Sequence, residues 1–139
     1  MMILVDTSIL IDYFKGNRNK EIEKFHFIQE KGIPFGINSH IYLEVLQGSK
    51  TEKDYKVLKK YLDTQIFYEL KNGRESYAEA AKMYLKLRHK GITVKSTIDC
   101  LIARVAIEND LFLLHNDTDF TRISKHFPLK IWGILVEGY

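Results

Sequence analysis

Short apolar runs alternate with amphipathic helical patterns along most of this chain. The runs MILV at residues 2–5, PFGI at 34–37 and LFLL at 111–114 are brief and continuous, which is typical of strands that are buried on both faces. The segments after the first two runs repeat their apolar residues at helical spacing. No two of these runs are joined by a two-residue hairpin turn. The alternation therefore predicts βαβ units and a mainly parallel sheet, which is an α/β fold.

Further elements follow from the same periodicities and from their end signals. Thr7 or Ser8 is expected to cap a first helix that ends at Gly16, and Asn38 and Ser39 are expected to cap another. Helices are expected over 19–31, 40–48, 50–63, 74–90 and at the start of 96–120, with further strands at 65–70 and 130–136. Residues 1–139 contain no repeat or linker, so one domain is predicted.

The composition narrows the class of protein. With 45% hydrophobic and 28% charged residues the chain resembles an ordinary globular protein, and its net charge of +3 is compatible with nucleic acid without demanding it. The single cysteine, Cys100, excludes an internal disulfide and a zinc site built from several thiolates. The N-terminus lacks the pattern of a signal peptide and no run is long enough to cross a bilayer. We expect a cytoplasmic protein that is not bound to a membrane.

Five acidic residues stand where a parallel sheet forms its binding crevice. Asp6 directly follows the first apolar run, and Asp117 and Asp119 follow LFLL. Asp99 lies in the first turn of its expected helix, and Glu44 lies inside the apolar segment IYLEVL. Ligands of open α/β sheets bind beyond the carboxyl ends of the strands, so all five carboxylates could face one crevice.

Crowded carboxylates repel one another, and a divalent cation removes that penalty. Mg²⁺ and Mn²⁺ prefer hard oxygen ligands and leave positions open for water and phosphate oxygens. Such an ion can lower the pKa of a bound water and stabilise charge on a phosphate. Hydrolysis of a phosphodiester is therefore the natural reaction for an acid-lined crevice that holds a metal.

Each acid also has a purely structural interpretation. Asp99 could complete a capping box at the start of its helix. Asp6 and Asp117 could be ordinary N-caps, and Asp119 could be a solvated acid of a first helical turn. Glu44 could lie on an exposed stripe, although an unpaired charge buried among its apolar neighbours would be costly.

The segments that carry these acids resemble a known family. VDTSILID, LEVLQG, DCLIARVAIEND and LLHNDTDF look like the motifs of a PIN domain, in the order found in VapC-type toxins of toxin–antitoxin pairs. The resemblance implies a three-layer α/β/α fold and a ribonuclease that depends on Mg²⁺ or Mn²⁺. It gives Asp6, Glu44 and Asp99 the first three acidic positions. Asp117 or Asp119 takes the fourth, and we favour Asp117 as the metal ligand.

The same resemblance implies partners. It predicts an RNA substrate, a small VapB-type antitoxin that binds a groove and neutralises the toxin, and a homodimer formed through helices. Two positions depart from the family pattern: His115 stands where a small hydroxyl residue is common, and Arg104 replaces a small residue. Arg104 shares a helical stripe with Cys100 and Glu108, so we expect it to face solvent.

Other interpretations compete with the nuclease. One is a catalytically silent, PIN-like domain that binds RNA or protein. Another is a haloacid-dehalogenase-like phosphotransferase, but such enzymes need a second aspartate at the position that Ser8 occupies. The basic group Lys86, Arg88, Lys90 and Lys95 leads into the Asp99 helix and is the better candidate for contacts with an RNA backbone.

Overall fold

Five parallel strands form the central sheet of the computed structural model, which describes residues 2–133. They are β1 (Ile3–Val5), β2 (Phe35–Ile37), β3 (Ile66–Phe67), β4 (Phe112–Leu114) and β5 (Lys130–Ile131). Their order is β3-β2-β1-β4-β5, and every pairing is parallel, which confirms the predicted sheet. The strand expected over 130–136 is observed only at its start, because residues 134–136 lie outside the described part of the chain.

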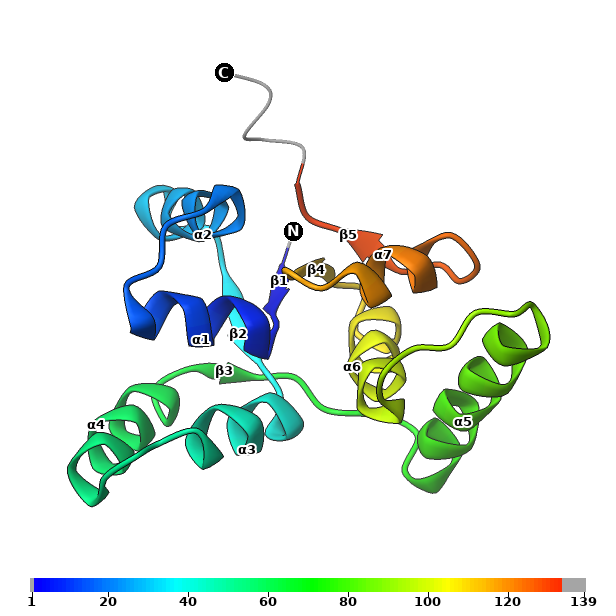
Figure 1. Cartoon of the computed structure of the whole chain (residues 1–139), viewed down its shortest axis with the longest axis horizontal. Coiled ribbons are helices and arrows are strands. Elements are labelled where there is room, and N and C mark those ends of the chain that lie inside the picture. The colour runs from blue at the N-terminus through cyan, green and yellow to red at the C-terminus, as the bar shows by residue number, and fades with distance from the viewer. Residues whose placement is uncertain (1, 134–139) are drawn as a thin grey trace.

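Helices cover both faces of this sheet. In the described residues they are α1 (Thr7–Lys15), α2 (Lys20–Lys31), α3 (Ser39–Gln47), α4 (Glu52–Leu62), α5 (Arg74–His89), α6 (Thr97–Glu108) and α7 (Thr118–Ser124). Right-handed crossovers place α1 to α4 on one face and α5 to α7 on the other. Figure 1 shows the first group to the left of β1 and the second to its right. The fold is the expected three-layer α/β/α arrangement.

The core forms around β1, whose three side chains are all fully buried. β3 is shorter than the expected strand over 65–70. The N–H of Tyr68 still bonds the carbonyl of Ile37, but the chain then leaves the sheet. None of the helices found in residues 2–133 combines the length and apolarity needed to cross a membrane.

The contact between α5 and α6 contains a buried carboxylate, and it corrects the expectation that Arg104 faces solvent. The Glu108 side chain is 4% exposed and the Arg104 side chain is 20% exposed. Arg104 donates two hydrogen bonds to Glu108 Oε2, at 3.2 and 3.0 Å. Glu108 Oε1 accepts from the Lys71 N–H and the Ser76 hydroxyl. Because Arg104 is held inside this contact, it is not a phosphate-binding group.

We expect Glu108→Ala to lower the free energy of unfolding by about 3 kcal/mol, because it leaves the Arg104 guanidinium in this contact without its acceptor. Urea denaturation measures the change. Lys59→Ala is the control, since Lys59 and Asp63 form a solvent-exposed ion pair at 2.7 Å, and exposed pairs contribute little to stability. Equal losses in the two variants would show that the buried network contributes nothing special.

Candidate active site

The strand order places a crevice between β1 and β4. The chain leaves these neighbouring strands toward opposite faces of the sheet, through α1 and α7 respectively. This is a topological switch point, where open α/β sheets bind their ligands. The N–H of Asp6 donates to the carbonyl of Leu114 at 3.0 Å, so the two strand ends lie side by side.

Asp6 begins α1 and is buried, with 5% of its surface exposed. Its Oδ2 accepts from the backbone N–H of Ser8 at 3.1 Å and from the Ser8 hydroxyl at 2.7 Å. The expectation that Thr7 or Ser8 caps this helix is therefore wrong, since Asp6 itself is the cap. Burial raises the pKa of Asp6 to about 6, against the hydrogen bonds from Ser8, which lower it.

Glu44 lies in the second turn of α3 and is half-buried. The hydroxyl of Thr7 donates to Glu44 Oε1 at 3.0 Å, across the contact between α1 and α3. Glu44 is therefore neither on a fully exposed stripe of its helix nor a buried charge without a partner. The bond places Glu44 beside the start of α1, next to Asp6.

Asp99 lies in the first turn of α6, but it does not cap that helix. Ser96 is the N-cap, and its hydroxyl accepts from the N–H of Ile98 at 3.1 Å. The Asp99 carboxylate accepts no hydrogen bond from residues 2–133. Burial and, after it, the charges of Asp117, Asp6, Asp119 and Glu44, in that order, together raise its pKa to about 7. The five predicted acids therefore act on one another, with Asp99 at the centre.

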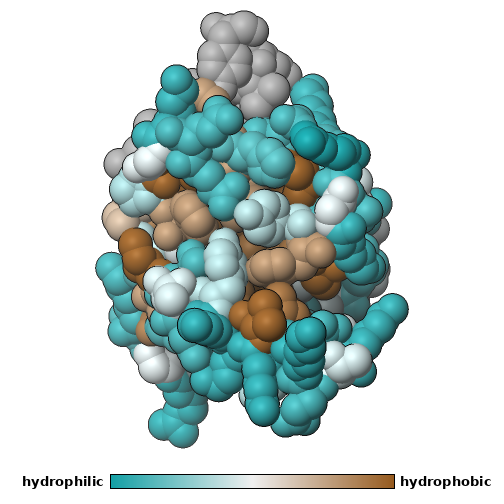
Figure 2. Space-filling view, turned by 90° about the vertical axis from the view of Figure 1, so that its left-hand side faces the viewer, coloured by the Kyte–Doolittle hydropathy of each residue, from teal (hydrophilic) through white to brown (hydrophobic). Residues whose placement is uncertain are grey.

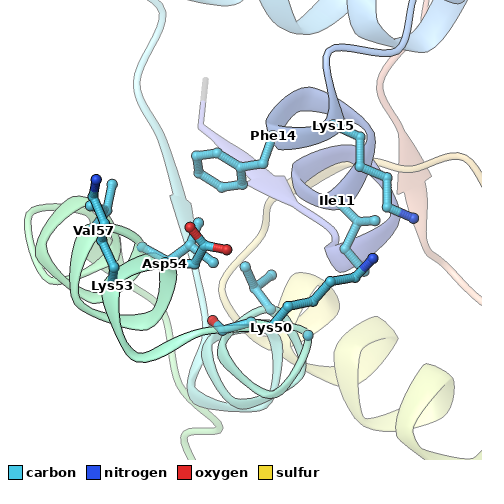
Figure 3. A pocket seen from close by; sticks show the side chains of 11 residues that line it. Ile11, Phe14, Lys15, Lys50, Lys53, Asp54 and Val57 are labelled. Atoms are coloured by element: carbon cyan, nitrogen blue, oxygen red, sulfur yellow. The ribbon is translucent and has the colours of Figure 1, made fainter.

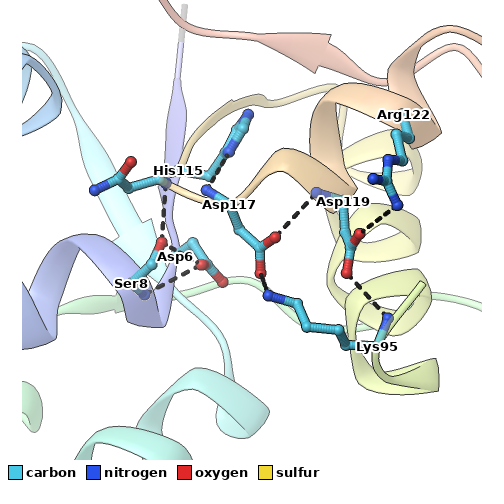
Figure 4. A network of polar contacts seen from close by, with 8 residues as sticks. Asp6, Ser8, Lys95, His115, Asp117, Asp119 and Arg122 are labelled. Carbon is cyan, nitrogen blue, oxygen red and sulfur yellow. Dashed lines mark hydrogen bonds and ion pairs between the residues drawn. The ribbon is translucent and has the colours of Figure 1, made fainter.

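Asp117 and Asp119 occupy the start of α7, in different environments (Figure 4). Asp117 is the N-cap: its Oδ1 accepts the Asp119 N–H at 2.9 Å, and its Oδ2 lies 3.6 Å from Lys95 Nζ. Asp119 is buried, which rules out the structural alternative of a solvated acid. Its Oδ2 accepts the Lys95 N–H at 3.0 Å, and its Oδ1 lies 3.4 Å from Arg122.

A polar network that the sequence did not predict supports the loop between β4 and α7. The backbone N–H of Asn116 donates to the Ser8 hydroxyl at 2.9 Å, and its side-chain amide donates to Asp12 at 3.2 Å. His115 Nδ1 accepts the N–H of Asp117 at 3.0 Å, so its imidazole orients this loop. Ser8 and Asp12 lie one turn apart on α1, which is the single sequence signal that could have indicated the contact.

The acids fit a divalent metal. One carboxylate oxygen each from Asp99, Asp117 and Asp119 lies within 4.8 Å of the others. Asp6 and Glu44 are outside this group of three, but their charges reach Asp99. Clustered oxygen ligands, one of them without a hydrogen-bond donor, are suited to a hard cation such as Mg²⁺ or Mn²⁺.

Cys100, next to Asp99, does not offer a competing nucleophile. Its thiol is fully buried, and burial together with the charges of Asp99 and Asp119 raises its pKa to about 11. A thiol in this state is not the reactive thiolate. The chemistry of the crevice therefore belongs to its carboxylates.

The raised pKa of Asp99 predicts an unusual pH dependence. In the unfolded chain its pKa is ordinary, near 3.8. The folded protein therefore holds this proton more tightly, and Asp99 adds stability below about pH 4 that is lost as the pH rises to about 7. We expect Asp99→Asn to match the wild type near pH 4.5 and to exceed its stability at pH 8 by on the order of 2 kcal/mol. Urea denaturation in EDTA at both pH values measures the difference.

The difference in stability between Asp99→Asn and the wild type removes the contributions of titratable groups that both proteins contain. These include His115, whose pKa burial lowers and whose contribution to stability has the opposite pH dependence. Identical pH profiles of stability for Asp99→Asn and the wild type would contradict a raised pKa at Asp99.

Known proteins resemble the chain over most of its length. The family model for the PIN domain matches residues 3–126. Ribonuclease VapC1 of Methanocaldococcus jannaschii is 30% identical over 132 residues, which are 94% of this chain and 86% of that protein. Ribonuclease VapC11 of Mycobacterium tuberculosis is 28% identical over 125 residues, which are 89% of this chain and 92% of that protein.

Solved structures agree on the fold. VapBC2 from Rickettsia felis, bound to a promoter DNA fragment, matches with a TM-score of 0.72 at 21% identity, over 96% of this chain and 100% of that one. VapBC-1 from nontypeable Haemophilus influenzae matches with a TM-score of 0.68 at 22% identity, over 94% of this chain and 96% of that one. The matched model, the 30% identity and the shared fold together establish that this chain belongs to the PIN domain family.

Proposed function

We propose that this protein is a metal-dependent endoribonuclease that acts as the toxin of a toxin–antitoxin pair and hydrolyses phosphodiester bonds of RNA. The observation that carries the proposal is the group of five carboxylates from four separate segments around Asp99. Relatives named as ribonucleases support the substrate class. We propose further that residues 1–139 act as one PIN-like domain.

Asp6, Glu44, Asp99 and Asp117 are the proposed metal-holding residues. The metal, when bound, lowers the pKa of a water and stabilises negative charge on the phosphate. Asp119 also lies in the cluster, but its side chain is 4% exposed, against 20% for Asp117, and its Oδ2 already accepts the backbone N–H of Lys95 at 3.0 Å. We therefore propose that Asp119 has a structural role, in which its hydrogen bond from Lys95 holds the segment before α6 against the start of α7. Ser8 orients Asp6, and Thr7 orients Glu44.

Asp6→Asn and Asp99→Asn should each lower the rate of RNA cleavage in Mg²⁺ or Mn²⁺ by at least about 100-fold, because each removes a charge from the metal site. Cleavage of a labelled RNA, followed on gels, measures the rate. Asp63→Asn is the control, because Asp63 is exposed and pairs with Lys59 outside the crevice.

Full activity in EDTA, or unchanged rates in both crevice variants, would contradict the metal mechanism. A wild-type protein that binds RNA and cleaves none of it under these conditions would instead be the catalytically silent domain. A phosphotransferase of this kind would need a second acid at position 8, whereas Ser8 is a hydrogen-bond donor to Asp6, so this alternative is disfavoured.

An apolar groove between α1, α3 and α4 is the proposed site of the antitoxin. Its volume is about 540 Å³, and apolar side chains that include Ile11, Phe14 and Val57 line it. Figure 2 looks onto this side of the molecule, where apolar surface lies within a hydrophilic surround. In Figure 3 the side chains of Phe14 and Ile11 extend from α1 on one side of the groove, and Val57 lies on α4 on the other.

The groove suits an amphipathic segment with acidic flanks. Lys15, Lys50 and Lys53 line it together with one acid, Asp54, and the excess of lysines complements acidic groups of a partner. Ile11 lies one helical turn beyond Thr7, and Gly48 lies one turn beyond Glu44. A partner in the groove therefore reaches to within one turn of the acids. The VapBC structures that share the fold support such a partner.

We expect Val57→Glu to weaken binding of the antitoxin at least tenfold, because Val57 is 63% exposed in the free protein and faces the groove. Titration calorimetry with the purified cognate antitoxin measures the affinity. Ile66→Glu is the control, with a side chain of similar exposure on β3. Equal affinities of the wild type and Val57→Glu would remove the groove from the interface.

A homodimer formed through helices is also part of the proposal. Leu43 on α3 and Tyr77 on α5 are 60% and 50% exposed, and such an interface would cover them. The ring of Tyr77 lies 6.4 Å from that of His40, so α3 and α5 present these side chains from neighbouring positions.

A further inference from the structure

A second pocket lies between the end of α5 and the end of α7. Its volume is about 290 Å³, and its lining residues are Lys86, Leu87, Lys90, His126 and Phe127. Leu87 and Phe127 pack against the core and form an apolar wall. The remaining lining residues are two lysines and a histidine, and none of the lining residues is acidic.

Helix α7 lies between this pocket and the acids, with one end at each. At the start of that helix, the backbone N–H of Lys95 bonds Asp119. At its end, His126 and Phe127 share the pocket with Lys86 and Lys90. The segment 86–95 thus contacts both ends of a helix of seven residues, about 10 Å long, and runs beside it in the opposite direction.

The basic side chains of segment 86–95 and of α7 are exposed to solvent, where a ligand can reach them. Lys86 and Lys90 are exposed, and no carboxylate in residues 2–133 lies within 4 Å of either amine. At the other end of the path the Lys95 side chain is 74% exposed and the Arg122 side chain is 52% exposed. Arg88 is different, because its guanidinium lies 5.5 Å from the centre of the Tyr84 ring.

Lys95 links the acidic cluster to the other basic side chains beside α7. Its side chain lies along the base of the acidic group, with Nζ beside Asp117 (Figure 4). A cation placed among the carboxylates would repel this ammonium. A phosphate bound at the crevice would then be the natural partner of Lys95.

From this juxtaposition we propose that the path from Lys95 along α7 to the Lys86–Lys90 pocket binds the sugar–phosphate backbone of the RNA substrate. The proposal rests on the proposed function, because it names how that same crevice holds its substrate. Lysine side chains bind phosphates as point charges without reading sequence. The path therefore contributes affinity and direction to the strand, and leaves the choice of sequence to other contacts.

The test is binding of fluorescein-labelled, single-stranded 20-mers, one rich in U and one rich in A, measured by anisotropy from 50 to 300 mM KCl. Asp99→Asn is the background, so that the RNA is not cleaved. We expect Lys86→Ala/Lys90→Ala to bind both RNAs at least fivefold more weakly and to reduce the slope of log K against log[KCl] by about 1.4, or 0.7 for each lost phosphate contact.

The matched control is Lys56→Ala/Lys60→Ala on α4. These two lysines are exposed and have the same spacing, so their loss changes the net charge equally. An unchanged slope in Lys86→Ala/Lys90→Ala, or equal losses in both double variants, would overturn the proposal. So would a background protein that binds neither RNA.

Cleavage by the same double variants in the otherwise wild-type chain separates this proposal from the proposed function. We expect Lys86→Ala/Lys90→Ala to raise KM and leave kcat unchanged, because the pocket touches substrate away from the reacting phosphate. If the wild type shows no metal-dependent cleavage, the proposed function is overturned. The salt dependence of RNA binding by the Asp99→Asn protein still tests whether the basic path binds RNA.

Discussion

The adjacent carboxyl ends of β1 and β4 determine where the acids of this protein meet. One hydrogen bond, from the N–H of Asp6 to the carbonyl of Leu114, joins those ends. The helices that start at the same edge add Glu44 and Asp99, and burial together with the neighbouring charges raises the pKa of Asp99 to about 7. Such repulsion is a cost that the fold alone does not offset. A bound cation would remove it, so the same clustering of charges that is unfavourable without a metal makes the crevice suited to holding one.

The positions of these acids were predictable because they depend on local patterns. Continuous apolar runs at 2–5 and 111–114 indicated buried strands, and a parallel sheet brings the residues after such strands together. Asp6 and Asp117 followed directly from that argument. The helical period around Glu44 indicated its helix, and its place inside the apolar segment IYLEVL marked it among the acids before the resemblance to the PIN domain gave it a role.

Contacts between distant segments were not predictable from such patterns. One alternative for Asp99 was a capping box with Ser96, but only Ser96 bonds the helix N–H, and the Asp99 carboxylate has no donor. The alternative for Asp119 was a solvated acid, but the segment that contains Lys95, 24 residues away in sequence, covers it. The Asn116–Asp12 bond spans 104 residues. Only the packed tertiary structure determines which polar groups such loops bring together.

A divalent cation held by the carboxylates around Asp99 can be located by crystallography. Crystals of the wild-type protein are grown with Mn²⁺, and anomalous diffraction is recorded above the manganese edge. We expect an anomalous peak in the crevice with oxygen atoms of Asp99 and Asp117 as ligands. Absence of any peak beside these two residues at saturating Mn²⁺, or a peak bound elsewhere with Asp99 uncoordinated, would contradict it.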